Sequence, residues 1–244
     1  MNMPLTKSRQ QNVDTSTSLF VVELLKLMKS RYDYRELSKI TGLPISTLTR
    51  YVTNKTLPRG AKTRELLNRL IEDLDIPSMV RERIRMNNGF VDITPVITDG
   101  SLLKLITLHA VHGFAGSKIT GVISLDEAGI PIATCIGLMM DRKIFYVSDK
   151  LVWDADEALQ LTYYVKEAAE YKSVWLPRSA INKKENLLAV VGVLKQPALI
   201  RELNSRIIEA GGTISGLFSV VALENALAEL SLVSAGRRIS LLTV

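Results

Sequence analysis

The sequence is poor in the side chains that build covalent cross-links and metal centres. Its 244 residues include one cysteine and two histidines, so an intramolecular disulfide is excluded and a Cys-based or His-rich metal site is not expected. A single cysteine is typical of proteins kept in a reducing compartment. We therefore expect a cytoplasmic protein that uses no metal and no other cofactor.

Long apolar segments are also missing. The most apolar stretch near the beginning, residues 19–28, is interrupted by Glu23 and Lys26 and is too short to cross a bilayer. Residues 1–17 are polar and lack the apolar core of a secretory signal. These absences predict no membrane partner, and the Ser/Thr/Gln-rich composition predicts a disordered tail over residues 1–16.

Positive charge is in excess, and the excess is local. The formal net charge is +6, but residues 1–90 contain 16 Lys/Arg against 9 Asp/Glu, whereas the remainder contains 15 against 16. A basic first third joined to a near-neutral remainder favours a polyanion-binding module followed by a neutral one. The turn sequence Asn87-Asn88-Gly89 indicates domains over residues 17–88 and 89–244.

The first domain is predicted to be all-α. Asp33, followed three residues later by Glu36, has the pattern of a capping box at a helix start. Gly42 is placed to supply the left-handed backbone that ends the same helix. Apolar spacing and these signals predict helices over residues 18–28, 34–40, 44–52 and 61–74.

The segment from Glu36 to Val52, ELSKITGLPISTLTRYV, resembles the helix-turn-helix of Cro-like and lac-repressor-type regulators. The resemblance implies a core made of Leu37, Ile40, Leu43, Leu48 and Val52. Helical geometry turns residues 45, 46, 49 and 50 to the opposite face. The predicted DNA-binding residues are Lys39, Ile45, Ser46, Thr47, Thr49, Arg50, Lys55 and Arg59.

These side chains suit both sequence reading and phosphate neutralisation. Arg50 can contact a guanine edge through two hydrogen bonds, worth about 1–3 kcal/mol of discrimination, and Ile45 suits a thymine methyl. Lys39, Lys55 and Arg59 suit sequence-independent phosphate contacts. The alternative is a small helical bundle whose solvated basic face contacts other proteins. We favour duplex DNA as the partner.

Beyond residue 89, apolar strand-like runs alternate with helical stretches. Strands are predicted over residues 119–125, 143–147, 187–193 and 214–223, helices over 100–112, 130–138, 157–170 and 199–210, and a strand or extended lead-in over 90–97. The strands are continuously apolar, which favours an α/β domain with a parallel sheet covered by helices. Ligands bind such sheets beyond the carboxyl ends of the strands, here the loops after Ser124 and Val193.

Three motifs in this domain are similar to type I phosphoribosyltransferases. GVISLDEAGIPIA, residues 121–133, resembles the strand, pyrophosphate loop and helix of that family. NLLAVVGVLKQPALIREL, residues 186–203, stands in place of the phosphoribosyl-pyrophosphate loop, and EAGGTISGLF, residues 209–218, matches the following turn and strand. The resemblance covers roughly residues 90–230 and implies the parallel-sheet fold of that family. A helix-turn-helix ahead of such a domain resembles archaeal phosphoribosyltransferase-like transcription regulators.

Departures from the family pattern argue against catalysis. Gly192 and Val193 stand where the enzymes have two acidic residues that hold ribose hydroxyls. Pro197 removes an N–H donor from the phosphate loop. We therefore expect no catalytic residue and no enzyme activity. The predicted ligand-binding residues are Asp126, Glu127, Ala128, Gly129, Lys195, Gln196 and Ala198.

Several assignments stay open on the sequence. Lys195 either attracts an anionic ligand or is an ordinary solvated lysine, and Asp126 and Glu127 either recognise ribose or an amine or are exposed loop acids. The leading hypothesis is a homodimeric regulator that binds a near-palindromic operator and senses a nucleotide-like or phosphorylated small-molecule effector. The alternatives are an active purine- or orotate-type phosphoribosyltransferase and a non-catalytic scaffold that binds RNA.

Overall fold

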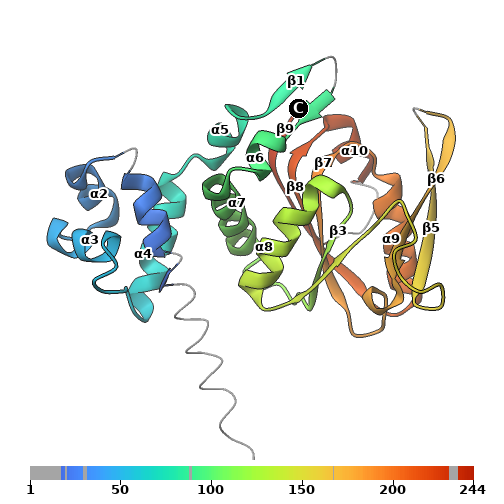
Figure 1. The fold of residues 1–244 in the computed structure, drawn as a ribbon, viewed down its shortest axis with the longest axis horizontal. Coiled ribbons are helices and arrows are strands. Elements are labelled where there is room, and N and C mark those ends of the chain that lie inside the picture. Colours follow the sequence, from blue (N-terminus) through green and yellow to red (C-terminus); the bar gives the residue numbers. More distant parts are fainter. Residues whose placement is uncertain (1–17, 20, 30–31, 88–89, 167, 231–235) are drawn as a thin grey trace, which may run out of the picture. The chain divides into compact units, whose positions relative to one another are not determined.

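A computed structural model describes residues 18–19, 21–29, 32–87, 90–166, 168–230 and 236–244 (Figure 1). The predicted tail over residues 1–16 lies outside this set. The chain divides into two compact units, Met1–Asp75 and Ile76–Val244. The division therefore falls earlier in the chain than the boundary at residue 88 that we predicted from the turn sequence.

The described part of the first unit is helical, as predicted. Residues 21–29 are helical, and α2 (Tyr34–Thr41), α3 (Ile45–Val52) and α4 (Ala61–Asp73) follow. The predicted capping box is present: Asp33 accepts hydrogen bonds from the backbone N–H groups of Arg35 and Glu36, and the Glu36 carboxylate accepts one from the Asp33 N–H at 2.7 Å. Gly42 ends α2 with φ +67°, the left-handed conformation that glycine adopts at low cost.

The core of the first unit differs from the prediction at two positions. Leu37, Leu43 and Leu48 are buried as expected. Ile40 and Val52, which we also placed in the core, are only half-buried. Tyr51 is buried instead, because on the short helix α3 it lies three residues beyond Leu48 and so shares its inward face.

The second unit is an α/β domain built on a five-stranded parallel sheet. The strand order is β4-β3-β7-β8-β9, and every neighbouring pair is parallel. Figure 1 shows α7 and α8 on one side of this sheet and α9 on the other. The strands are β3 (Gly121–Ser124), β4 (Lys143–Tyr146), β7 (Asn186–Leu194), β8 (Thr213–Ala222) and β9 (Arg237–Thr243); the helices are α5 (Ile76–Arg81), α6 (Thr94–Ile97), α7 (Gly100–Gly113), α8 (Ile130–Met140), α9 (Ala198–Glu209) and α10 (Glu224–Leu230).

Two antiparallel hairpins complete the unit. β1 (Arg85–Asn87) pairs with β2 (Phe90–Asp92), so the predicted lead-in over residues 90–97 is a short strand followed by α6. β5 (Ala158–Val165) pairs with β6 (Glu170–Pro177). The helix predicted over residues 157–170 is therefore wrong. Buried side chains recur along β5 against the hairpin partner and α9, and this long-range packing outweighs the helix propensity of its Ala, Leu and Gln residues.

Candidate functional sites

The exposed face of α3 presents the side chains predicted to read DNA. Ile45, Ser46, Thr49 and Arg50 are exposed, with 43% of Ile45 accessible. Leu48 lies on the opposite, buried face. The outward orientation predicted for these four residues is therefore confirmed. Thr47, which we also placed in the DNA-binding set, is half-buried.

The loop after α3 is tied to the end of that helix. The Lys55 backbone N–H donates to the Arg50 carbonyl at 2.9 Å, and the Thr53 hydroxyl donates to the Thr49 carbonyl at 2.6 Å. These bonds hold the backbone of Lys55 next to that of Arg50. Lys39 and Arg59 are exposed as well, so all four basic side chains of the predicted set are accessible.

Thr49 uses part of its hydrogen-bonding capacity within α3. Its hydroxyl donates to the Ile45 carbonyl at 2.9 Å. A hydroxyl oxygen keeps acceptor lone pairs when its proton is donated. Thr49 can therefore accept a hydrogen bond from a ligand on the exposed face without losing its contact in the helix.

The second candidate site lies where β3 and β7 end. Because these strands are parallel neighbours, their carboxyl ends meet at one edge of the sheet. The loop after β3 leads into the short 3-10 helix η1 (Glu127–Gly129). Asp126, the residue before η1, reaches across to the end of β7.

The Asp126 carboxylate joins the two strand ends. One oxygen, Oδ1, accepts from the backbone N–H groups of Gly129 and Gly192, each at 2.8 Å. The other, Oδ2, accepts from Gly192 at 3.0 Å and Val193 at 3.1 Å. Asp126 is therefore not an exposed loop acid, and its contacts within the chain are to backbone N–H groups on both sides of the site.

Burial and hydrogen bonding act in opposite directions on Asp126. Burial raises the pKa of its carboxyl above the ordinary value, and this effect is the largest. The N–H donors and the positive charge of Lys195 lower the pKa but offset only part of the rise. The carboxyl group is thus partly removed from water, while it accepts hydrogen bonds from three backbone N–H groups.

Position 192 has no room for a side chain. A Cβ atom on Gly192 would lie 2.6 Å from the Ala128 Cβ and 2.9 Å from the Ile93 Cδ1. These separations are well inside normal carbon–carbon contact distances. The loop after β3 and Ile93 therefore close over the end of β7.

A cavity of about 250 Å³ adjoins Asp126. Of the seven predicted ligand-binding residues, only Asp126, Lys195 and Gln196 line it; Tyr163 of β5 adds a fourth polar side chain. Tyr163 was missed because the segment was predicted as a helix, and the alternating pattern of residues 158–165 was the signal that would have found it. Glu127 is exposed, and Ala128, Gly129 and Ala198 do not line the cavity.

Lys195 is held at the edge of this cavity. Its Nζ lies 4.7 Å from the centre of the Phe90 ring, within the range of a cation–π interaction. Its charge also acts on Asp126. Lys195 itself is half-buried and the Phe90 ring is 62% exposed, so the attraction of an anionic ligand by Lys195 stays a prediction.

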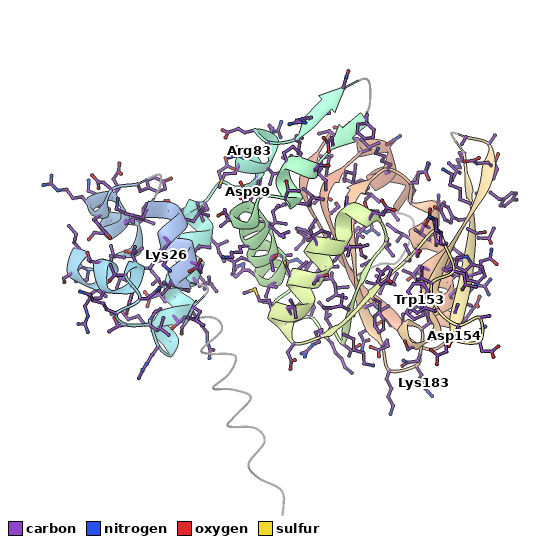
Figure 2. The ribbon with its side chains drawn as sticks, in the orientation of Figure 1. Lys26, Arg83, Asp99, Trp153, Asp154 and Lys183 are labelled. Atoms are coloured by element: carbon purple, nitrogen blue, oxygen red, sulfur yellow. The ribbon has the colours of Figure 1, made fainter. Side chains whose placement is uncertain are left out.

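A wider cavity of about 560 Å³ lies near the start of α7 and is lined by Arg83, Arg85, Asp92 and Asp99 among others. Figure 2 shows Arg83 beside Asp99, with Nη1 and Oδ2 3.5 Å apart. Asp92 accepts a hydrogen bond from the Thr94 N–H at 2.8 Å. Both acids thus have structural partners in this cavity.

The described residues contain no group of three or more His, Cys, Asp or Glu side chains placed to hold a metal ion. None of the helices they form is both long and apolar enough to span a membrane.

Comparisons with known proteins identify the fold of the second unit. No protein-family model and no curated protein matches the chain. Adenine phosphoribosyltransferases do match in structure: that of Thermoanaerobacter pseudethanolicus has a TM-score of 0.61 at 16% identity, over 69% of this chain and 99% of the other. The enzyme of Rhodothermus marinus has a TM-score of 0.60 at 18% identity, over 69% of this chain and 98% of the other. The enzyme of Giardia lamblia has a TM-score of 0.58 at 10% identity, over 69% of this chain and 97% of the other.

The chain contains a domain whose fold is similar to that of adenine phosphoribosyltransferases, and we call it the phosphoribosyltransferase-like domain for that fold. At these identities the likeness is one of fold, and it agrees with the predicted parallel-sheet architecture. Within the phosphoribosyltransferase-like domain, the strand end at Gly192 and Val193 contacts Asp126 through backbone N–H groups.

Proposed function

We propose that the protein is a DNA-binding transcription regulator. In this proposal α2 and α3 form a helix-turn-helix, and the phosphoribosyltransferase-like domain is non-catalytic and serves dimerisation and the sensing of a nucleotide-like or phosphorylated small molecule. The observation that carries the proposal is the exposed face of α3, where Ile45, Ser46, Thr49 and Arg50 all reach solvent. The basic charge excess of the first ninety residues supports it.

The proposed complex places α3 in the major groove of duplex DNA. Arg50 donates two hydrogen bonds to a guanine edge, and Ile45 packs against a thymine methyl. Lys39, Lys55 and Arg59 neutralise phosphates and fix the position of the helix without reading sequence. A homodimer would place two such helices about 34–36 Å apart on a near-palindromic operator.

Effector binding controls this complex only under one condition. A ligand shifts the spacing of the two recognition helices when its affinity differs between two arrangements of the dimer. The cavity beside Asp126, Tyr163 and Lys195 is the proposed effector site.

Selection from a random duplex pool, followed by fluorescence anisotropy on the enriched site, tests the proposal. Arg50→Ala should weaken binding to that site by about 5- to 150-fold, the equivalent of about 1–3 kcal/mol, and relax one base position. Lys55→Ala should weaken binding to all sequences and lower the salt slope by about 1. Lys184→Ala, which removes an exposed lysine of the second unit, is the matched control and should bind as the unaltered protein does.

The result against the proposal is specific. If the unaltered protein shows no salt-dependent binding to any duplex, or if Lys184→Ala and Lys55→Ala have equal effects, α3 is not a DNA-binding surface. Competition with structured RNA separates DNA recognition from the RNA-scaffold alternative, because structured RNA at equal concentration would displace duplex DNA from a protein that serves as an RNA scaffold.

An active phosphoribosyltransferase is the second candidate, and the fold likeness to adenine phosphoribosyltransferases favours it. The residues at the strand end do not, since Gly192 offers no carboxylate for ribose and no space for one. This candidate predicts pyrophosphate release from phosphoribosyl pyrophosphate and a purine or orotate. A coupled pyrophosphate assay with the full chain decides between the two.

A further inference from the structure

The backbone around Asp126 has the form of an anion-binding nest. The N–H groups of Gly129, Gly192 and Val193 come from two separate segments and all point at one carboxylate, over distances of 2.8–3.1 Å. Converging backbone N–H groups of this kind bind phosphate and carboxylate ions in many proteins. Here their partner belongs to the chain itself.

The surroundings make the nest suited to one negative charge and no more. Lys195 is the cation that acts on Asp126, and it is also shared with the Phe90 ring. A Cβ on Gly129 would lie 2.5 Å from the Asp126 Oδ1, so the loop fits closely around the carboxylate. A second anion would meet both the occupied donors and the repulsion of the Asp126 charge.

We propose that the Asp126 carboxylate is a built-in anion that closes this nest to phosphate and carboxylate ligands. Removing it opens an anion site between the loop after β3 and the end of β7. This has a consequence for the effector, which rests on the proposed function: the adjacent cavity takes a small, partly apolar molecule that places no phosphate in the nest. The apolar walls provided by Leu125, Val191 and Leu199 agree with such a ligand.

Ion-specific rescue of Asp126→Ala tests the proposal. The substitution leaves three N–H donors without their acceptor, so the thermal midpoint of the full chain should fall in sodium chloride. Sodium formate or phosphate at equal ionic strength should restore it in a saturable manner. The unaltered protein should show no such ion-specific gain. Glu127→Ala is the matched control, because it removes the neighbouring exposed acid, and it should behave as the unaltered protein does.

Two results would overturn the proposal. One is an Asp126→Ala protein that gains no more from formate or phosphate than Glu127→Ala does. The other is an unaltered protein that binds phosphate as well as the variant, which would mean that the nest was never closed.

A second measurement covers the case in which Asp126→Ala fails to fold. Asp126→Asn keeps the size of the side chain but has one acceptor oxygen in place of two. At least one amide proton resonance of Gly129, Gly192 or Val193 should then move upfield, and none should respond to phosphate in the unaltered protein. Unchanged resonances in Asp126→Asn would overturn the proposal. None of these measurements involves DNA, so this proposal and the proposed function fail separately.

Discussion

Replacing Gly192 by alanine tests how closely the loop after β3 packs on the end of β7. The added Cβ would lie 2.6 Å from the Ala128 Cβ, 2.9 Å from the Ile93 Cδ1 and 3.0 Å from the Ala128 carbonyl carbon. Carbon atoms pack best at about 3.5–4.0 Å, so the loop must shift by roughly 1 Å. Overpacking of this kind costs about 1–3 kcal/mol of unfolding free energy, and we expect Gly192→Ala to be destabilised by that amount.

Gly100→Ala is the matched control. Nothing lies within 4 Å of a Cβ at Gly100, and its backbone is not in the left-handed region. The same chemical change there should be neutral or stabilise the protein by up to about 1 kcal/mol, because alanine restricts the unfolded chain. The two variants differ in the space around the added methyl group.

Urea unfolding followed by tryptophan fluorescence is the assay. Trp153 and Trp175 are the two tryptophans of the chain, and both belong to the second unit, so the signal reports on the domain that contains Gly192. With an m-value of about 2 kcal/mol/M, the midpoint should fall by roughly 0.5–1.5 M without a change in slope. A midpoint for Gly192→Ala equal to that of Gly100→Ala would refute the close approach and, with it, the closed strand end.

Two further predictions concern the sheet and the first unit. Burial acts to raise the pKa of Glu185, but hydrogen bonds from Lys143, at 2.6 Å, and from Thr120 outweigh burial, and the pKa is lowered. The stability that the Glu185 carboxylate contributes is therefore present above its ordinary pKa of 4.5 and is lost as pH falls through the folded-state pKa. Glu185→Gln should flatten the acid side of a urea-midpoint-against-pH curve, and an unchanged curve would contradict this. Leu48→Ala, at a fully buried site, should lower the free energy of unfolding by about 2–5 kcal/mol and speed amide hydrogen exchange across α2 and α3. Ile45→Ala, on the exposed face, should leave the exchange rates unchanged. Equal exchange rates in the two variants would show that α3 does not pack through Leu48.

The elements with strong local signals could be predicted from the sequence. α2 begins at Asp33 with the expected capping box and ends at Gly42 in the left-handed conformation, since both features depend on neighbouring residues alone. The continuous apolar runs of β3, β7 and β8 predicted buried parallel strands, because a strand covered on both faces has no polar side to alternate with. The structure confirms these strands and their parallel pairing.

The features that were missed depend on contacts between distant parts of the chain. Tyr163 lines the cavity because β5 pairs with β6 and packs on α9. The helix prediction for this segment gave weight to its Ala, Leu and Gln residues and not to the alternating pattern of residues 158–165. Asp126 accepts a hydrogen bond from Gly192, which lies 66 residues later in the sequence. No local pattern predicts that an acidic loop residue will accept hydrogen bonds from the backbone N–H groups of another strand. The sequence therefore predicted the correct edge of the sheet for the candidate cavity, but not the hydrogen bonds of the polar side chains that line it.

The strand order has a consequence for synthesis of the chain. β3 lies between β4 and β7, and Ser124 pairs with Val190, which the ribosome adds 66 residues later. At about 5–20 residues per second, the edge of β3 that will face β7 waits roughly 3–13 s for its partner. During that interval the residues Gly121–Ser124, which are buried in the finished sheet, lack the strand that covers one of their two edges.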